Sequence, residues 1–248
     1  MPKTVFKCTA SYNGEPYSGW QKQKTDTTVQ GTIEYALEKY FGHPVKTSGA
    51  SRTDAGVHAF GQVFIFTVDT KLEPENIMAI MNDMLPPDIR IINAEKTGKS
   101  FHPRHNVRKK LYRYVIFNGR TMYPFYRGRC WHIEKRIDVS KMKEAAGFFR
   151  GVKDYYSFSG SGADTKTFER EVEKIRIKKA GNFIMVDFTA RSFLYNMIRR
   201  MVSVMVSYAL GDLSSADIEK LFSSRDRTLI KKIAPGEGLY LVKITYKN

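Results

Sequence analysis

One acidic residue stands in a setting that suits chemistry. Residues 51–56, SRTDAG, bring a cation and a carboxylate two positions apart among small side chains, directly before an apolar stretch at residues 61–68. Small side chains leave room for a ligand near the backbone, and a carboxylate can act as a nucleophile. Aspartate is also a frequent turn residue that binds neighbouring backbone amides. By themselves the residues favour this turn interpretation for Asp54.

The overall charge indicates a polyanionic partner. The chain of 248 residues has 41 Lys and Arg against 25 Asp and Glu, a formal net charge of +16. An excess this large favours nucleic acid. An acid in a loop that faces a polyanion needs a chemical or metal-binding reason, which keeps a catalytic role for Asp54 open.

The basic residues gather beside aromatic ones. A first group lies within ten positions: Arg104, Arg108, Lys109, Lys110 and Arg113, interleaved with Tyr112 and Tyr114. A second group follows: Arg127 and Arg129, flanked by Tyr123, Phe125, Tyr126 and Trp131. Cations beside aromatic rings suit phosphate contacts with base stacking, the combination that binds RNA loops. The alternative is that Tyr112 and Tyr114 are core residues of a strand.

Several familiar chemistries lack their residues. The sequence has no G-x-x-x-x-G-K-[ST] loop and no G-x-G-x-x-G motif, so neither ATP nor NAD is expected. His102 and His105 are three apart, but they stand among Arg and Lys residues that would repel a cation. Neither a cofactor nor a metal is therefore expected.

Cysteine content and hydropathy bear on the compartment. Two isolated cysteines, Cys8 and Cys130, form neither a disulfide framework nor a metal motif, and a reducing cytosol is the simplest compartment. No apolar signal region stands at the start of the chain. The most apolar segment, residues 193–210, contains Arg199 and Arg200, so we expect no membrane span and a cytoplasmic protein.

The pattern of the elements predicts an α+β fold. The expected strands are residues 4–12, 61–68, 89–94, 111–117, 172–179 and 183–189. The expected helices are residues 29–41, 74–84, 140–150 and 192–210. Because the order is similar in both parts of the chain, we expect two similar halves, residues 1–105 and 106–248, with a central sheet and a cleft between them.

The predicted helix at residues 192–210 is apolar on most sides, so it should be largely buried. Its polar residues form one narrow stripe: Asn196, Arg199, Arg200, Ser203 and Ser207. Two arginines there need water, a carboxylate or a phosphate. The stripe either faces solvent or turns Arg199 toward an acid in the cleft, and the residues leave both open.

Residues 51–59, SRTDAGVHA, resemble the RTDAGVHA signature of the TruA-type tRNA pseudouridine synthases, a long and specific motif. Other segments resemble the same family in the same order and cover essentially the whole chain. They are YNG at 12–14, GWQ at 19–21, VQ at 29–30, FHPR at 101–104, YRY at 112–114, Phe193 with MIR at 197–199, and GLYL at 238–241.

This resemblance implies a fold and a reaction. The fold would be two α+β halves with a central, mostly antiparallel sheet flanked by helices and a cleft between the halves, in a homodimer. The reaction would be the isomerisation of uridine to pseudouridine in the tRNA anticodon stem-loop, at positions 38, 39 and 40. The family requires neither cofactor nor metal, which agrees with the motifs that the sequence lacks.

The resemblance also implies roles for particular residues. Asp54 would be the nucleophile, kept ionised by Arg199 or, as the second candidate, Arg52. Tyr112 would pack on the base and Leu241 would close its other side, once the uridine is flipped out of its stack. Further substrate contacts are expected from the basic residues Arg104, Arg108 and Lys110.

Three residues depart from the family pattern. Ser51 replaces the usual glycine, Pro103 the usual alanine, and Arg200 the usual asparagine. None of them removes a catalytic group, but they leave the RNA target open. The alternatives are the same chemistry on another RNA such as ribosomal RNA, or an RNA-binding protein without turnover.

Overall fold

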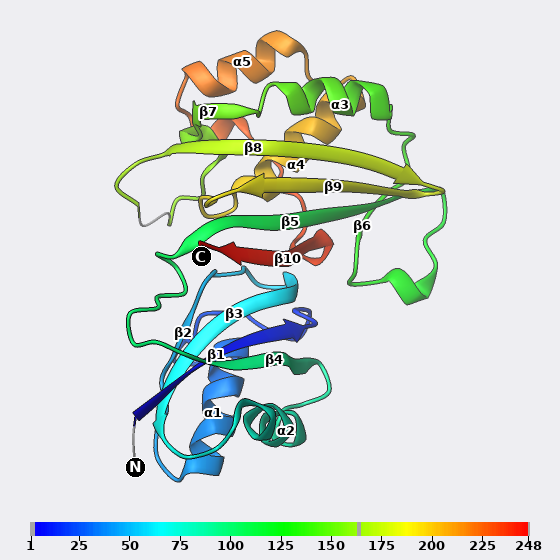
Figure 1. Ribbon diagram of the computed structural model, residues 1–248. Helices are drawn as coiled ribbons and strands as arrows, with labels where there is room; N and C mark the ends of the chain where they lie inside the picture. The colour runs from blue at the N-terminus through cyan, green and yellow to red at the C-terminus, as the bar shows by residue number, and fades with distance from the viewer. Residues whose placement is uncertain (1–2, 163–164, 248) are drawn as a thin grey trace. The chain divides into compact units, whose positions relative to one another are not determined.

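The computed structural model describes residues 3–162 and 165–247 (Figure 1). Met1 and Pro2, which belong to the start of the chain used for the localisation prediction, lie outside these residues. The chain divides into unit 1, Met1–Arg108 with Tyr240–Asn248, and unit 2, Lys109–Leu239. Helices and mostly antiparallel strand pairs make up the described elements, and the predicted α+β class is confirmed.

Unit 1 is built on strands in the order β4-β1-β3-β10, with β2 paired to β3. Their bounds are β1 Lys3–Tyr12, β2 Thr47–Gly49, β3 His58–Asp69, β4 Ile89–Thr97 and β10 Leu239–Tyr246. Strand β1 is antiparallel to both β3 and β4, whereas β10 runs parallel to β3. The last strand thus returns to the N-terminal unit, a distant pairing that leaves no local mark in the sequence.

Helix α1 (Val29–Phe41) has its bounds where the sequence predicts them. The Thr28 side chain accepts a hydrogen bond from the Gly31 amide at the first turn, and Gly42 ends the helix with a φ of 73°. The core face consists of Val29, Ile33, Ala36 and Leu37. Tyr40, which continues the same helical spacing, is 43% exposed.

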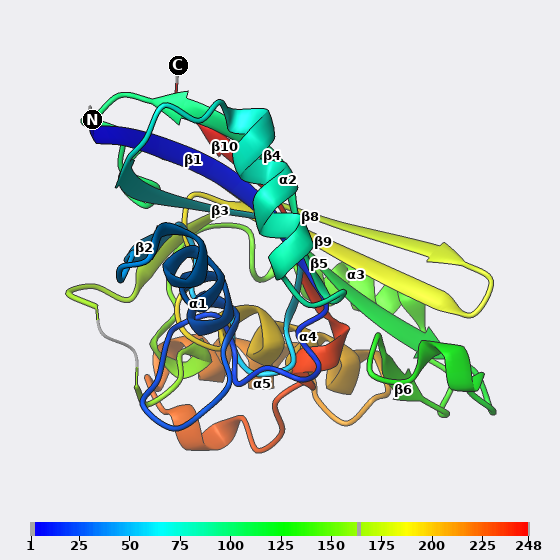
Figure 2. The ribbon, with the colours of Figure 1, turned by 90° about the horizontal axis from the view of Figure 1, so that it is seen from below.

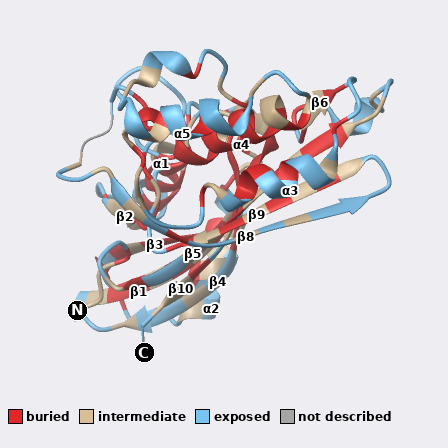
Figure 3. Ribbon diagram, turned by 90° about the horizontal axis from the view of Figure 1, so that it is seen from above, coloured by how far each residue is buried: buried red, intermediate tan, exposed pale blue. Residues whose placement is uncertain are grey.

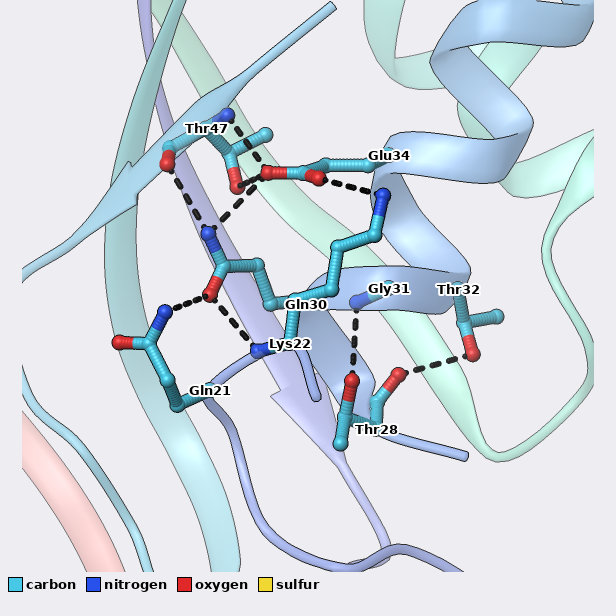
Figure 4. Close-up of polar contacts among 8 residues, drawn as sticks. All are labelled: Gln21, Lys22, Thr28, Gln30, Gly31, Thr32, Glu34 and Thr47. Carbon is cyan, nitrogen blue, oxygen red and sulfur yellow. Dashed lines mark hydrogen bonds and ion pairs between the residues drawn. The ribbon is translucent and has the colours of Figure 1, made fainter. Parts of the chain in front are cut away.

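A buried polar network joins α1 to β2 (Figure 4). The carboxylate of Glu34 accepts from the Thr47 amide at 2.9 Å, from Gln30 Nε2 at 3.1 Å and from Lys22 Nζ at 3.1 Å. Because the buried charge is paired and hydrogen-bonded, the cost of its desolvation is offset. The network fixes the position of β2, the strand that leads directly into the Asp54 stretch.

Helix α2 (Pro74–Met84) also has the predicted bounds. Proline at its first position suits a helix start, since the missing N–H would have no partner inside the helix. The helix lies along β4 (Figure 2) and buries Ile77 and Met81.

The strands of unit 2 follow the order β5-β9-β8-β7, with β6 paired to β5. Their bounds are β5 Val107–Asn118, β6 Trp131–Ile133, β7 Gly151–Asp154, β8 Glu169–Ala180 and β9 Phe183–Ala190. The pairs β5–β9, β8–β9 and β7–β8 are antiparallel. Strand β5 starts four residues before the predicted Leu111, so Arg108, Lys109 and Lys110 of the first basic group belong to the strand.

Helices α3 (Val139–Gly147), α4 (Met197–Ala209) and α5 (Ser215–Ser223) lie together on one side of the β8–β9 hairpin (Figure 1). Helix α4 is buried on nearly every side, as its composition predicts (Figure 3). Helix α5, which we did not predict, begins with a capping box formed by Ser214 and Asp217. In the described part of the chain, no helix is long and apolar enough to cross a membrane.

The predicted start of α4 at residue 192 is wrong. Asn196 has a left-handed backbone with a φ of 59°, so the helix begins only at Met197. Before it, the Tyr195 carbonyl accepts a hydrogen bond from the Gly160 amide at 2.8 Å. The hydrophobic period continues through these residues, and for that reason a periodicity argument does not detect the turn.

Candidate active site

Asp54 lies at a turn between β2 and β3. The Val57 amide donates to the Asp54 carbonyl at 3.1 Å, and Gly56 supplies the positive φ of 73° that the turn requires. The backbone of Asp54 is therefore that of a turn residue, and its side chain is half-buried. A turn position and a chemical role are compatible, because the turn uses the main chain.

The chain directly before Asp54 is held by buried groups. Ser51 exchanges two hydrogen bonds with the side chain of Gln62, and both residues are buried. The Thr53 carbonyl accepts from the Trp20 amide at 3.0 Å, and the Thr53 hydroxyl is 2.8 Å from the hydroxyl of Tyr12. The residues before the carboxylate are thus fixed at two points.

The segment after β1 packs directly on the Asp54 loop through two glycines. A Cβ on Gly14 would collide with the carbonyl of Val57. Gly19 has a φ of 89°, and a Cβ there would lie 2.6 Å from the Thr53 carbonyl oxygen. These contacts give a physical reason for the YNG and GWQ segments that resemble the family, because only glycine allows so close an approach.

The strand that leaves the loop is joined to the end of the chain. Nδ1 of His58 accepts from the Gly14 amide at 3.1 Å, which leaves the proton of the neutral ring on Nε2. The same ring stacks on Tyr240 with centroids 4.6 Å apart. Leu241 pairs with Ala59 in the β3–β10 register and is fully buried. The fold thus brings Leu241 into the unit that carries Asp54.

Arginines accompany the loop within unit 1. The Nε of Arg104 donates to the Gly49 carbonyl at 3.2 Å. Partial burial lowers the pKa of the Arg104 guanidinium, and the charge of Arg52 lowers it further. Both side chains, like that of Arg108 in β5, are exposed. Exposed guanidinium groups suit the phosphates of a nucleic acid. Pro103 is buried, and its carbonyl accepts from the Tyr246 hydroxyl.

In unit 2, both tyrosines of the predicted YRY strand are buried. Tyr112 pairs with Phe188 across β5 and β9 and packs edge-on against Phe193, with centroids 5.4 Å apart. Tyr114 donates its hydroxyl to the Pro235 carbonyl at 2.8 Å. Tyr114 is therefore a core residue with a satisfied hydroxyl.

The two neighbouring arginines of α4 have different surroundings. Arg199 is half-buried, and its Nε donates to the Ala234 carbonyl at 2.7 Å. Arg200 is only 9% exposed and donates to the carbonyls of Ser157 and Arg227. Burial lowers the pKa of the Arg200 guanidinium, and the charge of Arg227 lowers it further.

The possibility that the whole polar stripe of this helix faces solvent is wrong, since Arg200 and Ser203 are buried. Arg200 joins η2 (Tyr156–Phe158) to η3 (Arg227–Leu229). The departure from the family pattern at Arg200 therefore has a structural role inside unit 2.

Residues 119–129 form an exposed stretch that we name the aromatic–arginine segment. Phe125 is 85% exposed and Tyr123 is 61% exposed. Three arginines accompany them, namely Arg120, Arg127 and Arg129, and the stretch contains no acidic residue. Lys110, on β5, is half-buried. The second predicted basic and aromatic group is thus a surface feature, whereas the tyrosines of the first are buried.

Among the described residues, no group of three or more His, Cys, Asp and Glu side chains could hold a metal ion. The rings of His102 and His105 lie 4.1 Å apart. Burial lowers the pKa of His102, and the charges of His105 and Arg104 lower it further. Cys8 and Cys130 are buried and form no disulfide, and burial raises the pKa of the Cys8 thiol to about 12.

Gln62 is the polar residue that sequence reasoning missed. A glutamine inside the apolar stretch FGQVFIF is the available signal, because a buried carboxamide must satisfy both a donor and an acceptor. Its partner, the main chain of Ser51, is eleven residues away and could not be read from the sequence.

Comparison with known proteins identifies the family. A family model described as tRNA pseudouridine synthase matches residues 9–106 and 145–247. A tRNA pseudouridine synthase A of Thermoanaerobacter sp. (strain X514) is 38% identical over 235 residues, covering 95% of this chain and 96% of the relative. One of Ruminiclostridium cellulolyticum is 37% identical over 242 residues, covering 97% and 99%.

A Bacillus cereus protein named tRNA pseudouridine synthase A 2 is 35% identical over 242 residues, covering 97% of this chain and 99% of the relative. The similarity extends over nearly the whole length of this chain and of each of these relatives. The chain belongs to the tRNA pseudouridine synthase family.

Proposed function

We propose that this chain isomerises uridine to pseudouridine in tRNA, at positions 38, 39 and 40 of the anticodon stem-loop, with Asp54 as the nucleophile. One observation carries the proposal. In a chain of this family, the SRTDAGVHA stretch is a loop held by buried groups at Ser51 and Thr53, directly before a half-buried carboxylate. Such preorganisation is what a nucleophile requires.

The reaction breaks the bond between N1 of uracil and C1′ of ribose and forms a bond between C5 and C1′. N1 gains a proton and the proton on C5 is lost, so the product is an isomer of the substrate. The Asp54 carboxylate either attacks C1′ and is displaced when C5 bonds to C1′, or it removes the C2′ proton to give a glycal and returns that proton to C2′ when C5 bonds to C1′. The uridine must first leave its stack.

Other residues would bind the same uridine or keep Asp54 ionised. Arg199, or Arg52 as the second candidate, would keep Asp54 ionised, because a nearby cation favours the charged carboxylate. Tyr112 and Leu241 would pack against the two sides of the base. The remaining substrate contacts would come from Arg104, Arg108 and Lys110, through the phosphates. The exposure of Arg52, Arg104 and Arg108 supports roles that require access to RNA.

The target is tested by mapping. Unmodified tRNAs with a single uridine at position 38, 39 or 40 are incubated with the protein, and pseudouridine is located by a chemical method that blocks reverse transcription. We expect product at each of the three positions and none in a tRNA with cytidine there. Product in ribosomal RNA alone would favour the other target, and no product in either RNA would favour binding without turnover.

We also propose that the protein acts in the cytoplasm as a homodimer. The compartment is supported by two isolated cysteines in a family named for tRNA, and the dimer by the resemblance of the sequence. Light scattering at a range of concentrations tests the dimer. A mass of one chain, about 28.5 kDa by composition, would contradict it.

A further inference from the structure

We infer that Gln62 is a positioning residue for Asp54, acting through the main chain of Ser51. This rests on the proposed role of Asp54. Gln62 lies on β3 and is 0% exposed. Its Nε2 donates to the Ser51 carbonyl at 2.6 Å, and its Oε1 accepts from the Ser51 amide at 3.2 Å. One side chain therefore fixes both main-chain polar groups of a residue three positions before the nucleophile.

The site fits a carboxamide. A carboxamide offers a donor and an acceptor side by side, which an ionised carboxylate and an apolar side chain do not. The residue opposite Gln62 in the β1–β3 register is Ala10, whose small buried side chain leaves space beside it. If the carboxamide is removed, Ser51 loses two buried main-chain hydrogen bonds, each worth about 0.5–1.5 kcal/mol.

The consequence for Asp54 follows from the other fixed point. Thr53 is held by the Trp20 amide and by the Tyr12 hydroxyl, so the chain enters Asp54 from a residue fixed independently of Gln62. Without Gln62 the loop keeps this anchor and loses the one at Ser51. We therefore expect a misplaced carboxylate in a folded protein, which lowers kcat more than it changes KM.

The same geometry accounts for one departure from the family pattern. Gln62 binds the main chain of Ser51, and these two hydrogen bonds are available to any residue other than proline at this position. Serine in place of the usual glycine therefore leaves this anchor unchanged.

The test uses Gln62→Glu and Gln62→Met in the full-length protein with unmodified tRNA. A protonated glutamic acid donates and accepts as glutamine does, whereas the ionised form only accepts. Burial raises the pKa of such a carboxyl, so the neutral form prevails at low pH and is lost as pH rises through that pKa. Relative to wild type at the same pH, we expect the kcat of Gln62→Glu to be nearly unchanged at about pH 5 and about 100-fold lower at about pH 8.

Gln62→Met should lose about 100-fold in kcat at every pH, with KM within about threefold of wild type. If this variant does not fold, Gln62→Glu at low pH keeps the test decisive, because its neutral carboxyl retains both bonds. Folding is monitored by circular dichroism at each pH.

Asn82 offers a matched control. In helix α2 its carboxamide binds the main chain of Ile91 in the same two-bond manner, at 2.8 and 2.7 Å. Ile91 belongs to β4 and not to the Asp54 loop. The melting temperature of Asn82→Asp should fall further below that of wild type as pH rises, while its kcat follows the wild-type pH profile.

Two results would overturn the role of Gln62. One is kcat within about threefold of wild type in both Gln62 variants at every pH. The other is an equal pH-dependent loss of kcat in Asn82→Asp, which would indicate general destabilisation. Asp54→Asn is measured alongside: activity that survives it overturns the nucleophile assignment and the role of Gln62 with it. Inactive Asp54→Asn with fully active Gln62→Met overturns the role of Gln62 alone.

Discussion

The Asp54 loop and the aromatic–arginine segment are both irregular stretches, and they are built in opposite ways. In the loop, buried side chains from other elements hold the main chain of Ser51 and the side chain of Thr53, and Asp54 is half-buried. In the segment, the main chain holds itself by turns, with the Tyr126 amide on the Tyr123 carbonyl and the Arg127 amide on the Pro124 carbonyl. Its aromatic rings are largely exposed.

Under the proposed function, we infer from this difference that the two regions do different work on the tRNA. Bond making requires placement, which the loop obtains from buried hydrogen bonds. Holding RNA requires exposed rings and cations on a stable base, and Tyr126 provides that base by packing on Phe117 and Phe183 at 5.9 and 4.9 Å. We therefore expect changes in the loop to lower kcat and changes in the segment to raise KM.

Among changes that compare the two regions, the largest effect is expected at Gly14. In Gly14→Ala the new methyl group collides with the Val57 carbonyl and displaces the Asp54 turn, so kcat for pseudouridine formation should fall about 100-fold. Gly147→Ala is the control, because a Cβ there meets nothing within 4 Å. Steady-state kinetics with unmodified tRNA measure both. Wild-type kcat in a folded Gly14→Ala protein would break the link between loop placement and rate.

A smaller effect, on KM, is expected at Phe125. Phe125→Ala removes an exposed ring that can stack on a base, an interaction of about 1–3 kcal/mol, so KM should rise about 10-fold with kcat unchanged. Tyr35→Ala, which removes another ring, 62% exposed, is the control and should leave KM as it is. Equal KM values for wild type and Phe125→Ala would exclude the segment from RNA binding.

A smaller decrease in kcat than at Gly14 is expected at Tyr12. Tyr12→Phe removes the hydroxyl that contacts Thr53 and leaves the ring in the core, so a loss of about 1 kcal/mol should lower kcat about fivefold. The same kinetic assay measures it, with KM expected to stay constant. A rise in KM without a change in kcat would contradict the division of work between the two regions.

The smallest effect is expected on salt dependence. Arg127→Gln removes one exposed cation of the segment, so the slope of log binding constant against log salt should become shallower by about 0.7–0.9 if the side chain binds one phosphate. Filter binding of tRNA at several salt concentrations measures the slope. A slope identical to that of wild type would show that Arg127 makes no phosphate contact.

Local signals predicted much of the fold. Helix α1 ends where Gly42 stops it, and helix α2 begins at Pro74, as the sequence indicates. The start of α4 failed because the left-handed Asn196 interrupts a hydrophobic period that itself continues. The pairing of β10 with β3 joins segments about 180 residues apart, and no local pattern records such a contact.

The candidate site divides in the same way. Asp54 was selected because its neighbours resemble a family motif. The residue types of the loop alone favoured a turn, which the backbone does form. Gln62 and Arg200 were not assigned their roles, because each acts on carbonyls or amides far away in the chain. Residue types carry the chemistry of a site, whereas the supports of its backbone are visible only in three dimensions.

The most direct measurement is tritium release from tRNA labelled at C5 of uridine, with wild type and Asp54→Asn compared. The substitution keeps the size of the side chain and removes its charge and nucleophilicity. We predict release by wild type and none above background by Asp54→Asn, although this variant still binds tRNA. Sustained release by Asp54→Asn would contradict the assignment of Asp54 as the nucleophile.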